Sequence, residues 1–107
     1  MKTYIATRIN HEPVVLVDED GRASRLDPGR SLRINNHSPD GFEWGYGGSG
    51  PAQFALAILL DLTDDGDLAE SLHQEFKRRF VATAPKEGFR LAEEAIRAWI
   101  SATEQNR

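Results

Sequence analysis

An unbroken apolar stretch that follows a run of glycines limits the folds open to this chain more than any other feature. Residues 54–60 read Phe-Ala-Leu-Ala-Ile-Leu-Leu, and Pro51, Ala52 and Gln53 precede them. Proline suits the first position of a helix, where its missing N–H has no partner to lose, and Gln53 at the third position can fold back to the cap. Such a helix is apolar nearly all round, yet it is far shorter than the roughly 20 residues that cross a bilayer. The stretch therefore predicts a central, buried helix in a water-soluble domain.

The sequence before the glycines is typical of strands. Three segments are rich in β-branched or alternating apolar residues: 4–8, 14–17 and 23–26. The acidic residues and glycine at 18–21 predict a hairpin turn between the last two. Residues 31–35, after a Pro-Gly turn, and residues 42–44 alternate as well and are predicted to be strands. We expect an N-terminal antiparallel β-meander of about four strands.

Two more helices are predicted after the apolar stretch. Over about residues 67–81, apolar side chains recur every four residues, at Leu68, Leu72, Phe76 and Phe80. His73, Lys77 and Arg78 are expected away from this stripe. A third helix is predicted over about residues 90–102. Strands followed by helices predict an α+β fold, in which the meander packs against about three C-terminal helices within a single domain, 1–107.

Composition excludes several classes of protein. The chain has no cysteine, which excludes disulfides, zinc-thiolate and iron-sulfur sites and thiol nucleophiles, and predicts a cytoplasmic location. The first residues lead directly into strand-like sequence, without the basic start and apolar core of a signal peptide. No stretch is long enough to span a membrane, so no membrane association is expected. The formal net charge of −4 argues against direct nucleic-acid binding, which needs a surplus of Lys and Arg.

The glycine-rich run at residues 38–53 is where a function is expected. It reads Ser-Pro-Asp-Gly-Phe-Glu-Trp-Gly-Tyr-Gly-Gly-Ser-Gly-Pro-Ala-Gln. Gly45, Gly47 and Gly50 match the dinucleotide-binding fingerprint, but the second parallel strand that this fold needs does not follow. A P-loop is excluded because Gly50 is followed by Pro51, where that loop has Lys and a hydroxyl residue.

Two interpretations of these glycines remain open. In the first, the backbone N–H groups of Gly47, Gly48, Ser49 and Gly50 cradle an anion at the N-terminus of the helix. In the second, the glycines allow a tight turn and close packing, with Ser49 or Gly50 as the helix cap.

Titratable and aromatic side chains flank the glycines. His37, Asp40 and Glu43 are residue types that acid-base chemistry or a metal site uses, but their spacing matches no known ligand pattern and each suits a turn or a solvated position. Trp44 and Tyr46 are expected either to pack on the core or to contact a ligand or partner.

Aspartates cluster after the apolar helix, at Asp61, Asp64, Asp65 and Asp67. The spacing is similar to that of a calcium-binding loop, but Thr63 stands at its third position and Leu72 at its twelfth, where a bidentate Glu is required. An acidic turn between two helices is predicted, and neither a metal nor another cofactor is expected. The basic residues at 77–79 are predicted to form a solvated face.

The block at residues 36–59, Asn-His-Ser-Pro-Asp-Gly-Phe-Glu-Trp-Gly-Tyr-Gly-Gly-Ser-Gly-Pro-Ala-Gln-Phe-Ala-Leu-Ala-Ile-Leu, resembles the signature of a prokaryotic family known only as a domain of unknown function. The likeness continues through the helix at Phe76-Lys77 to Trp99. It implies a small protein of a kind often carried by plasmids, phages and other mobile elements. The family supplies no catalytic residues to transfer. In outline such a protein is similar to anti-defence proteins, including anti-CRISPR inhibitors, which bind and block a host protein complex.

We therefore expect a non-enzymatic protein-binding module whose partner is a host protein complex. The residues expected at its contact surface are Phe42, Glu43, Trp44, Tyr46, Gly47, Gly48, Ser49, Gly50 and Gln53. The acidic residues Asp61, Asp64, Asp65 and Asp67 are secondary candidates. The alternative is a domain that binds a small ligand, nucleotide or phosphate through the same glycine-rich loop, and an enzyme that uses His37, Asp40 and Glu43 is the third hypothesis.

Overall fold

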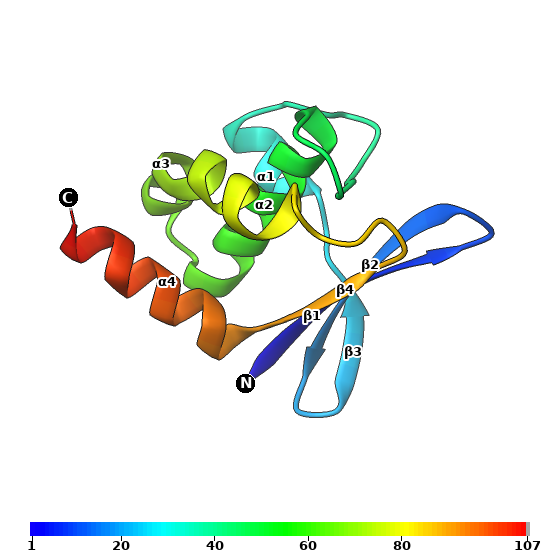
Figure 1. Cartoon of the computed structure of the whole chain (residues 1–107), viewed down its shortest axis with the longest axis horizontal. Helices are drawn as coiled ribbons and strands as arrows, with labels where there is room; N and C mark the ends of the chain where they lie inside the picture. The colour runs from blue at the N-terminus through cyan, green and yellow to red at the C-terminus, as the bar shows by residue number, and fades with distance from the viewer. Residues whose placement is uncertain (107) are drawn as a thin grey trace.

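The structure is a computed structural model and describes residues 1–106. Three strands come first, β1 (Lys2–Ile9), β2 (Glu12–Glu19) and β3 (Arg22–Arg25). Helices α1 (Gly29–Ile34), α2 (Ser49–Thr63) and α3 (Gly66–Phe76) follow, and α3 continues into a π-helical turn, η1 (Lys77–Val81). Strand β4 (Phe89–Ala92) and helix α4 (Glu93–Gln105) come last (Figure 1).

The strands form one antiparallel sheet in the order β3-β2-β1-β4. Two-residue turns join the first three strands, and all four turn residues have positive φ, from 52° to 90°: Asn10, His11, Asp20 and Gly21. This geometry matches the twist of the flanking strands. The predicted hairpin after Val17 is confirmed, and so is the α+β fold with four antiparallel strands.

Two segments predicted to be strands are not strands. Residues 31–34 lie in helix α1, because Pro28 already has helical angles and its carbonyl accepts the N–H of Leu32 at 3.0 Å. Residues 42–44 form an irregular loop. Phe42 and Trp44 both face the core from this loop, so their alternation reflects burial and not strand pairing.

The fourth strand is β4, which lies partly within the segment predicted to begin the last helix. Leu91 pairs with Tyr4, and Phe89 with Ala6, so both β4 side chains lie on the face of the sheet that carries the buried Tyr4 and Ala6. The helix itself begins at Glu93. The second predicted helix, over residues 67–81, is confirmed as α3 and η1.

Helix α2 is the centre of the core, as predicted. Every residue from Gly50 to Leu60 is buried. Its side chains pack against the inward positions of the sheet, which include Tyr4, Val15 and Val17. Helices α1, α2 and α3 lie on one side of the sheet, and α4 runs away from the end of β4 (Figure 1).

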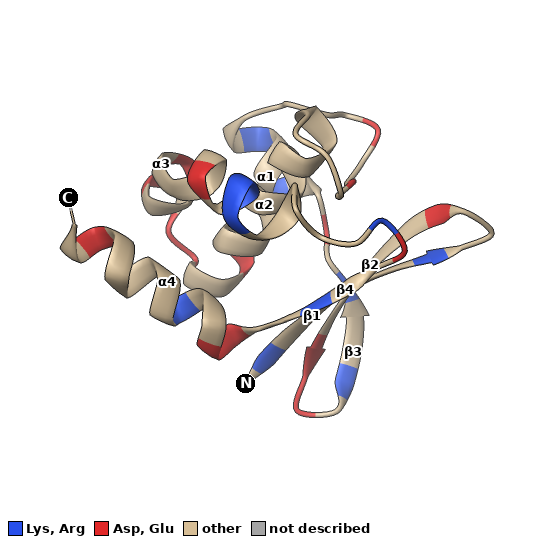
Figure 2. Cartoon of the chain, in the orientation of Figure 1, with Lys and Arg blue, Asp and Glu red and all other residues tan. Residues whose placement is uncertain are grey.

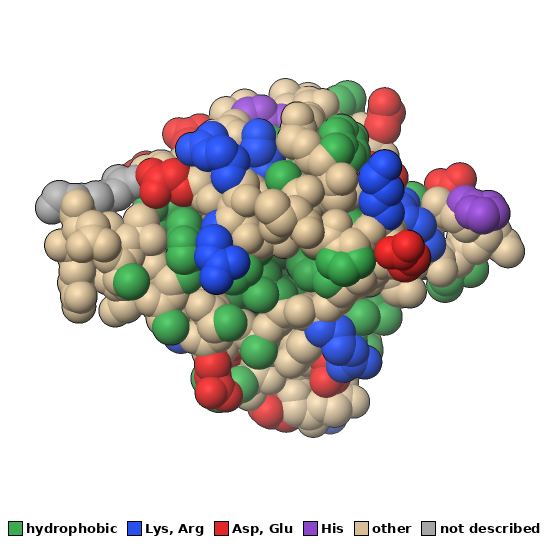
Figure 3. All heavy atoms as spheres, viewed as in Figure 1, with side chains coloured by type: hydrophobic (Ala, Val, Ile, Leu, Met, Phe, Trp, Pro, Cys, Tyr) green, Lys and Arg blue, Asp and Glu red, His purple; other side chains and the backbone are tan. Residues whose placement is uncertain are grey.

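Charged residues of both signs are distributed over the molecule. Acidic and basic residues occur on helices and strands alike (Figure 2). On the face shown in Figure 3, Lys and Arg side chains stand at several separate places and form no continuous basic surface. This distribution agrees with the expectation of solvated faces, while the absence of nucleic-acid binding stays a prediction.

Candidate functional site

The glycine-rich loop between α1 and α2 is tied to the turn that precedes β4. Gly45 has a φ of +87°, and its N–H donates to the carbonyl of Val81 at 3.0 Å. A Cβ at Gly45 would lie 2.8 Å from Cγ of Lys86 and 3.3 Å from the carbonyl oxygen of Ala84. A larger residue is therefore disfavoured twice, by the left-handed backbone and by contact with the neighbouring turn.

Trp44 anchors the loop in the core. Its side chain is completely buried, and its indole N–H donates to the carbonyl of Lys86 at 3.1 Å. The ring packs against Phe54 and Phe89, with centroids 5.9 and 6.1 Å away. Phe42 stacks on Phe54 from the same loop, at 5.3 Å. Trp44 is thus unavailable to a partner, which corrects its expected place at a contact surface.

Glu43 is held by Arg8 of strand β1. Two Arg8 nitrogens contact the two carboxylate oxygens at 2.8 and 3.2 Å, and Arg8 Nε donates to the carbonyl of Lys86. The guanidinium also lies over the Trp44 ring, 4.3 Å from its centroid. The hydrogen bond from Arg8 lowers the pKa of Glu43 below its ordinary value. Glu43 therefore clamps the loop to the sheet and is not a free acid.

Tyr46 and the residues after it form the exposed part of the loop. Tyr46 is 48% exposed, and Gly47 and Ser49 are exposed as well. The Tyr46 ring lies against Gly48, where any side chain would collide with it, and its hydroxyl approaches Gly50. Close packing of an aromatic ring on the backbone is thus one reason for glycine here, as in the second interpretation above.

Helix α2 begins earlier than predicted. It starts at Ser49 with Gly48 as its N-cap, so the expected cap at Ser49 or Gly50 is wrong by one or two residues. Gly48 makes no side-chain cap, its carbonyl accepts the N–H of Ala52 at 3.1 Å, and Pro51 has no N–H. Of the two residues before Pro51 in the first turn, Ser49 is exposed and Gly50 is buried.

Gln53 neither caps α2 nor faces a ligand, which corrects both expectations. Its side chain is completely buried, and its oxygen accepts the backbone N–H groups of His37 and Ser38 at 2.7 and 3.1 Å. Its amide nitrogen donates to Ser31 Oγ at 2.9 Å. Gln53 thus joins α1, α2 and the segment before the glycine-rich loop.

The three side chains of the enzyme hypothesis do not converge. His37 contacts His73 and Glu43 contacts Arg8. Asp40 is exposed in the turn that ends at Gly41. Within residues 1–106 no hydrogen bond or ion pair joins any two of His37, Asp40 and Glu43, and the same residues contain no group of three metal-ligating side chains.

His73 is buried, which differs from the position predicted for it. It was expected away from the apolar stripe of α3, but it is only 4% exposed. Its Nε2 lies 2.8 Å from Nε2 of His37. Because the two histidines are 36 residues apart and His37 lies in a polar turn sequence, no periodic pattern could have paired them.

The aspartates of the acidic turn after α2 have different contacts. Asp65 caps α3 by accepting the N–H of Leu68 at 3.1 Å. Asp64 ends α2 in the left-handed conformation and pairs with Arg30, and Asp67 stands exposed in the first turn of α3. These acids form no common surface with the glycine-rich loop.

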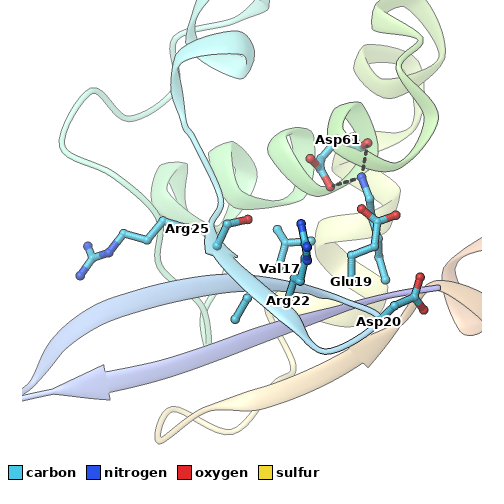
Figure 4. Close-up of a pocket in the computed structure, with 9 residues that line it drawn as sticks. Val17, Glu19, Asp20, Arg22, Arg25 and Asp61 are labelled. Carbon is cyan, nitrogen blue, oxygen red and sulfur yellow. Dashed lines mark hydrogen bonds and ion pairs between the residues drawn. The ribbon is translucent and has the colours of Figure 1, made fainter.

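Asp61 lies away from the turn, at a hollow of the surface. Its carboxylate accepts the Tyr4 hydroxyl at 2.6 Å and pairs with Lys2 Nζ at 3.1 Å. The hollow, of about 790 Å³, lies between the β2–β3 hairpin and α2, and Glu19 and Arg22 also line it (Figure 4). Its walls carry both charges, so it shows no preference for one class of ligand.

The comparisons with known proteins assign a family. The model of a family of unknown function, DUF6166, matches residues 4–102. The chain belongs to this family. No curated protein and no solved structure matches the chain. Family membership therefore brings no functional residues, and the site must be judged on its geometry.

None of the helices within residues 1–106 has the length and apolar character needed to cross a bilayer.

Proposed function

We propose that this chain is a non-enzymatic protein-binding module, whose contact surface is centred on Tyr46 and includes Gly47 and Ser49. The observation that supports the proposal most directly is the half-exposed Tyr46 ring on an otherwise anchored loop. Three large hydrophobic residues are exposed in the described chain. Met1 is at the terminus and Ile9 at the end of a hairpin strand, so Tyr46 is the one that a tied loop presents.

The anchors explain why such a loop suits binding. Trp44, the Arg8–Glu43 pair and the hydrogen bond from Gly45 hold the chain on the side before Tyr46, and helix α2 holds it on the other. A loop that is already ordered loses little conformational entropy when it binds. Tyrosine is also among the residues that most often dominate the energy of protein interfaces.

We propose further that the partner is a host protein complex and that the role is anti-defence, of the anti-CRISPR kind. The support for this part is the resemblance to small proteins of mobile elements. The basic side chains form no continuous surface on the face of Figure 3, which fits contact with a protein better than contact with a phosphate backbone.

A small-ligand, nucleotide or phosphate site at the N-terminus of α2 is the alternative. The local geometry gives it less support. Pro51 supplies no N–H, Gly50 is buried, and the side chain of Glu43 lies beside Gly50. An anion at a helix N-terminus is held by accessible backbone N–H groups, and few are available here.

The test of the main proposal is capture of the partner with the wild-type chain and with two variants. Tyr46→Ala removes the exposed ring of the loop, and Ile9→Ala is the matched control, because Ile9 is 59% exposed but lies on a hairpin. Retained proteins are identified by mass spectrometry, and each dissociation constant is then measured with the purified partner. We expect Tyr46→Ala to weaken binding about 30-fold, as loss of a 2 kcal/mol contact does.

The proposal fails if Tyr46→Ala binds the partner as tightly as the wild type does, or if Ile9→Ala weakens binding as much as Tyr46→Ala. The alternative has its own test, a thermal-shift screen with phosphate and nucleotides. A ligand at one hundred times its dissociation constant adds about 2.7 kcal/mol to the free energy of unfolding. A shift with phosphate that Tyr46→Ala leaves unchanged would favour the alternative.

A further inference from the structure

The contact between His37 and His73 requires that one of the two facing imidazole nitrogens carries a hydrogen and the other does not. Their Nε2 atoms are 2.8 Å apart, which is hydrogen-bond distance, so one nitrogen must carry a hydrogen and the other must offer a lone pair. Nδ1 of His73 lies 2.6 Å from the carbonyl oxygen of Glu70. A carbonyl oxygen only accepts, so the hydrogen of neutral His73 is on Nδ1 and its Nε2 is the acceptor. His37 is therefore the donor.

The first proton added to the pair and the second have different effects on the hydrogen bond between the two imidazoles. A proton that binds Nδ1 of His37 leaves the contact intact, since His37 Nε2 still donates. A proton on Nε2 of His73 turns both facing nitrogens into donors, and the hydrogen bond is lost. The pair thus holds with no added proton or with one, and breaks with two.

The groups around His73 shift the pKa of its imidazole. Burial lowers the pKa of His73, and the charges of His37 and Lys77 lower it further. The hydrogen bond to the Glu70 carbonyl and the Glu70 carboxylate act in the opposite direction. From helix α2, the side-chain oxygen of the neutral Gln53 accepts the backbone N–H of His37. His73 is thus neutral near pH 7 and takes a proton as the solution becomes acidic.

The pair joins two parts of the chain that have few other polar links. His37 belongs to the first part of the irregular segment between α1 and α2, ahead of the residues anchored at Glu43, Trp44 and Gly45, and His73 belongs to α3. The second support of this first part is Gln53, which accepts the backbone N–H groups of His37 and Ser38. Loss of the imidazole contact leaves these two hydrogen bonds at residues 37 and 38, while the later part of the segment keeps its own anchors.

We propose that His37 and His73 form a pH-sensitive latch, which holds the segment before the glycine-rich loop on helix α3 at neutral pH and releases it when both imidazoles are protonated. The latch itself needs no partner. Its control over partner binding rests on the function proposed above, because the released residues lie in the same connection between α1 and α2 as Tyr46.

Nuclear magnetic resonance of the full chain tests the latch without a partner. At about pH 7.5, imidazole nitrogen shifts should show the Nδ1–H tautomer for His73 and a protonated Nε2 for His37. Between about pH 7.5 and pH 5, the backbone N–H groups of His37 and Ser38 should lose at least about tenfold protection against hydrogen exchange, after correction for the intrinsic rate.

Three variants complete the test. His73→Gln removes the proton-binding site, so the protection of His37 and Ser38 should no longer depend on pH in this range. His11→Asn is the matched control, since His11 is exposed in the β1–β2 turn and Asn tolerates its positive φ of 71°. It should behave as the wild type does. If His73→Gln does not fold, His37→Ala removes the partner imidazole and should likewise abolish the pH dependence.

The latch is overturned by an Nε2–H tautomer of His73 at neutral pH. It is also overturned if protection in the wild type stays constant down to about pH 5, or if the pH dependence persists in His73→Gln or His37→Ala. A latch that works, together with partner binding that ignores pH, would instead refute its control of the binding loop.

Discussion

The glycine-rich loop and the acidic turn after α2 are the two regions whose composition stands out, and the structure uses them differently. In the loop, Trp44 and Glu43 are satisfied inside the chain, whereas Tyr46 is left half exposed with a tied backbone on either side. In the acidic turn, Asp65 caps a helix and Asp64 pairs with an arginine. Unusual composition therefore does not by itself show which side chains are exposed, and of these two regions only the loop leaves a large hydrophobic side chain at the surface.

Substitution of the buried Trp44 should reduce the stability of the fold far more than substitution of the exposed Tyr46. Trp44→Ala should lower the free energy of unfolding by about 3–5 kcal/mol, because it opens a cavity in the core and removes one of the two donors to the Lys86 carbonyl, the other being Arg8 Nε. Tyr46→Ala, in the same loop, should cost less than about 1 kcal/mol. Urea denaturation of both variants measures the contrast. Similar losses for the two would mean that the loop is not divided into an anchored and an exposed part.

Two glycines of the loop, Gly45 and Gly47, should differ in how much stability their replacement by alanine costs. Gly45→Ala should cost about 2 kcal/mol, since its φ of +87° is unfavourable for alanine and the new Cβ meets the turn at Lys86. The new Cβ of Gly47→Ala meets no atom within 4 Å, and this variant should raise the free energy of unfolding by less than about 0.5 kcal/mol, because alanine restricts the unfolded chain more than glycine does. Thermal unfolding of the pair checks the order. Equal costs would remove the steric reason for glycine at position 45.

A smaller effect examines whether the carboxylates of the acidic turn act separately. Asp65→Ala removes the cap of α3 and should cost about 1 kcal/mol. Asp67→Ala removes only a favourable charge in the first turn of that helix and should cost about 0.3 kcal/mol. The double variant should equal the sum of the two when measured by denaturation. A marked departure from additivity would indicate that these acids work as one site.

The Arg8–Glu43 pair should make a small contribution to stability that depends on pH. The pKa of Glu43 is lowered in the folded chain, so the clamp stabilises the fold above about pH 4.5, the ordinary value, and this contribution is lost as pH falls through the lowered pKa. Because both side chains are partly exposed, the difference from Glu43→Gln should be at most about 1 kcal/mol above that pH. The two proteins should converge in acid. A difference that grows on acidification would reverse the role given to Glu43.

Much of the fold follows from local patterns. The apolar stretch predicted the buried helix α2, because a helix without a polar face has no position but the core. Asp20-Gly21 predicted the hairpin, since those residues accept positive φ. The fourth strand was misplaced because Phe42 and Trp44 alternate as a strand does, while β4 is short and runs directly into α4.

The candidate site was predictable as a segment but not residue by residue. The glycines and aromatics directed attention to residues 42–50, but the sequence does not distinguish Trp44, which is buried, from Tyr46, which is not. Gln53 was expected at the helix cap, yet its side chain satisfies the backbone at His37 and Ser38. Such contacts depend on which segments meet, and a local pattern does not contain that information.

By itself the sequence determined the α+β class, the central helix and the position of the glycine-rich loop, because backbone preferences and hydrophobic periodicity act over a few residues. Only the tertiary structure decided which side chains of that loop are anchored, that Arg8 clamps Glu43, and that His37 meets His73. Those pairs join residues 35 and 36 positions apart. Their contacts arise from the packing of whole elements, which is why the exposed Tyr46 could be recognised only once the fold was known.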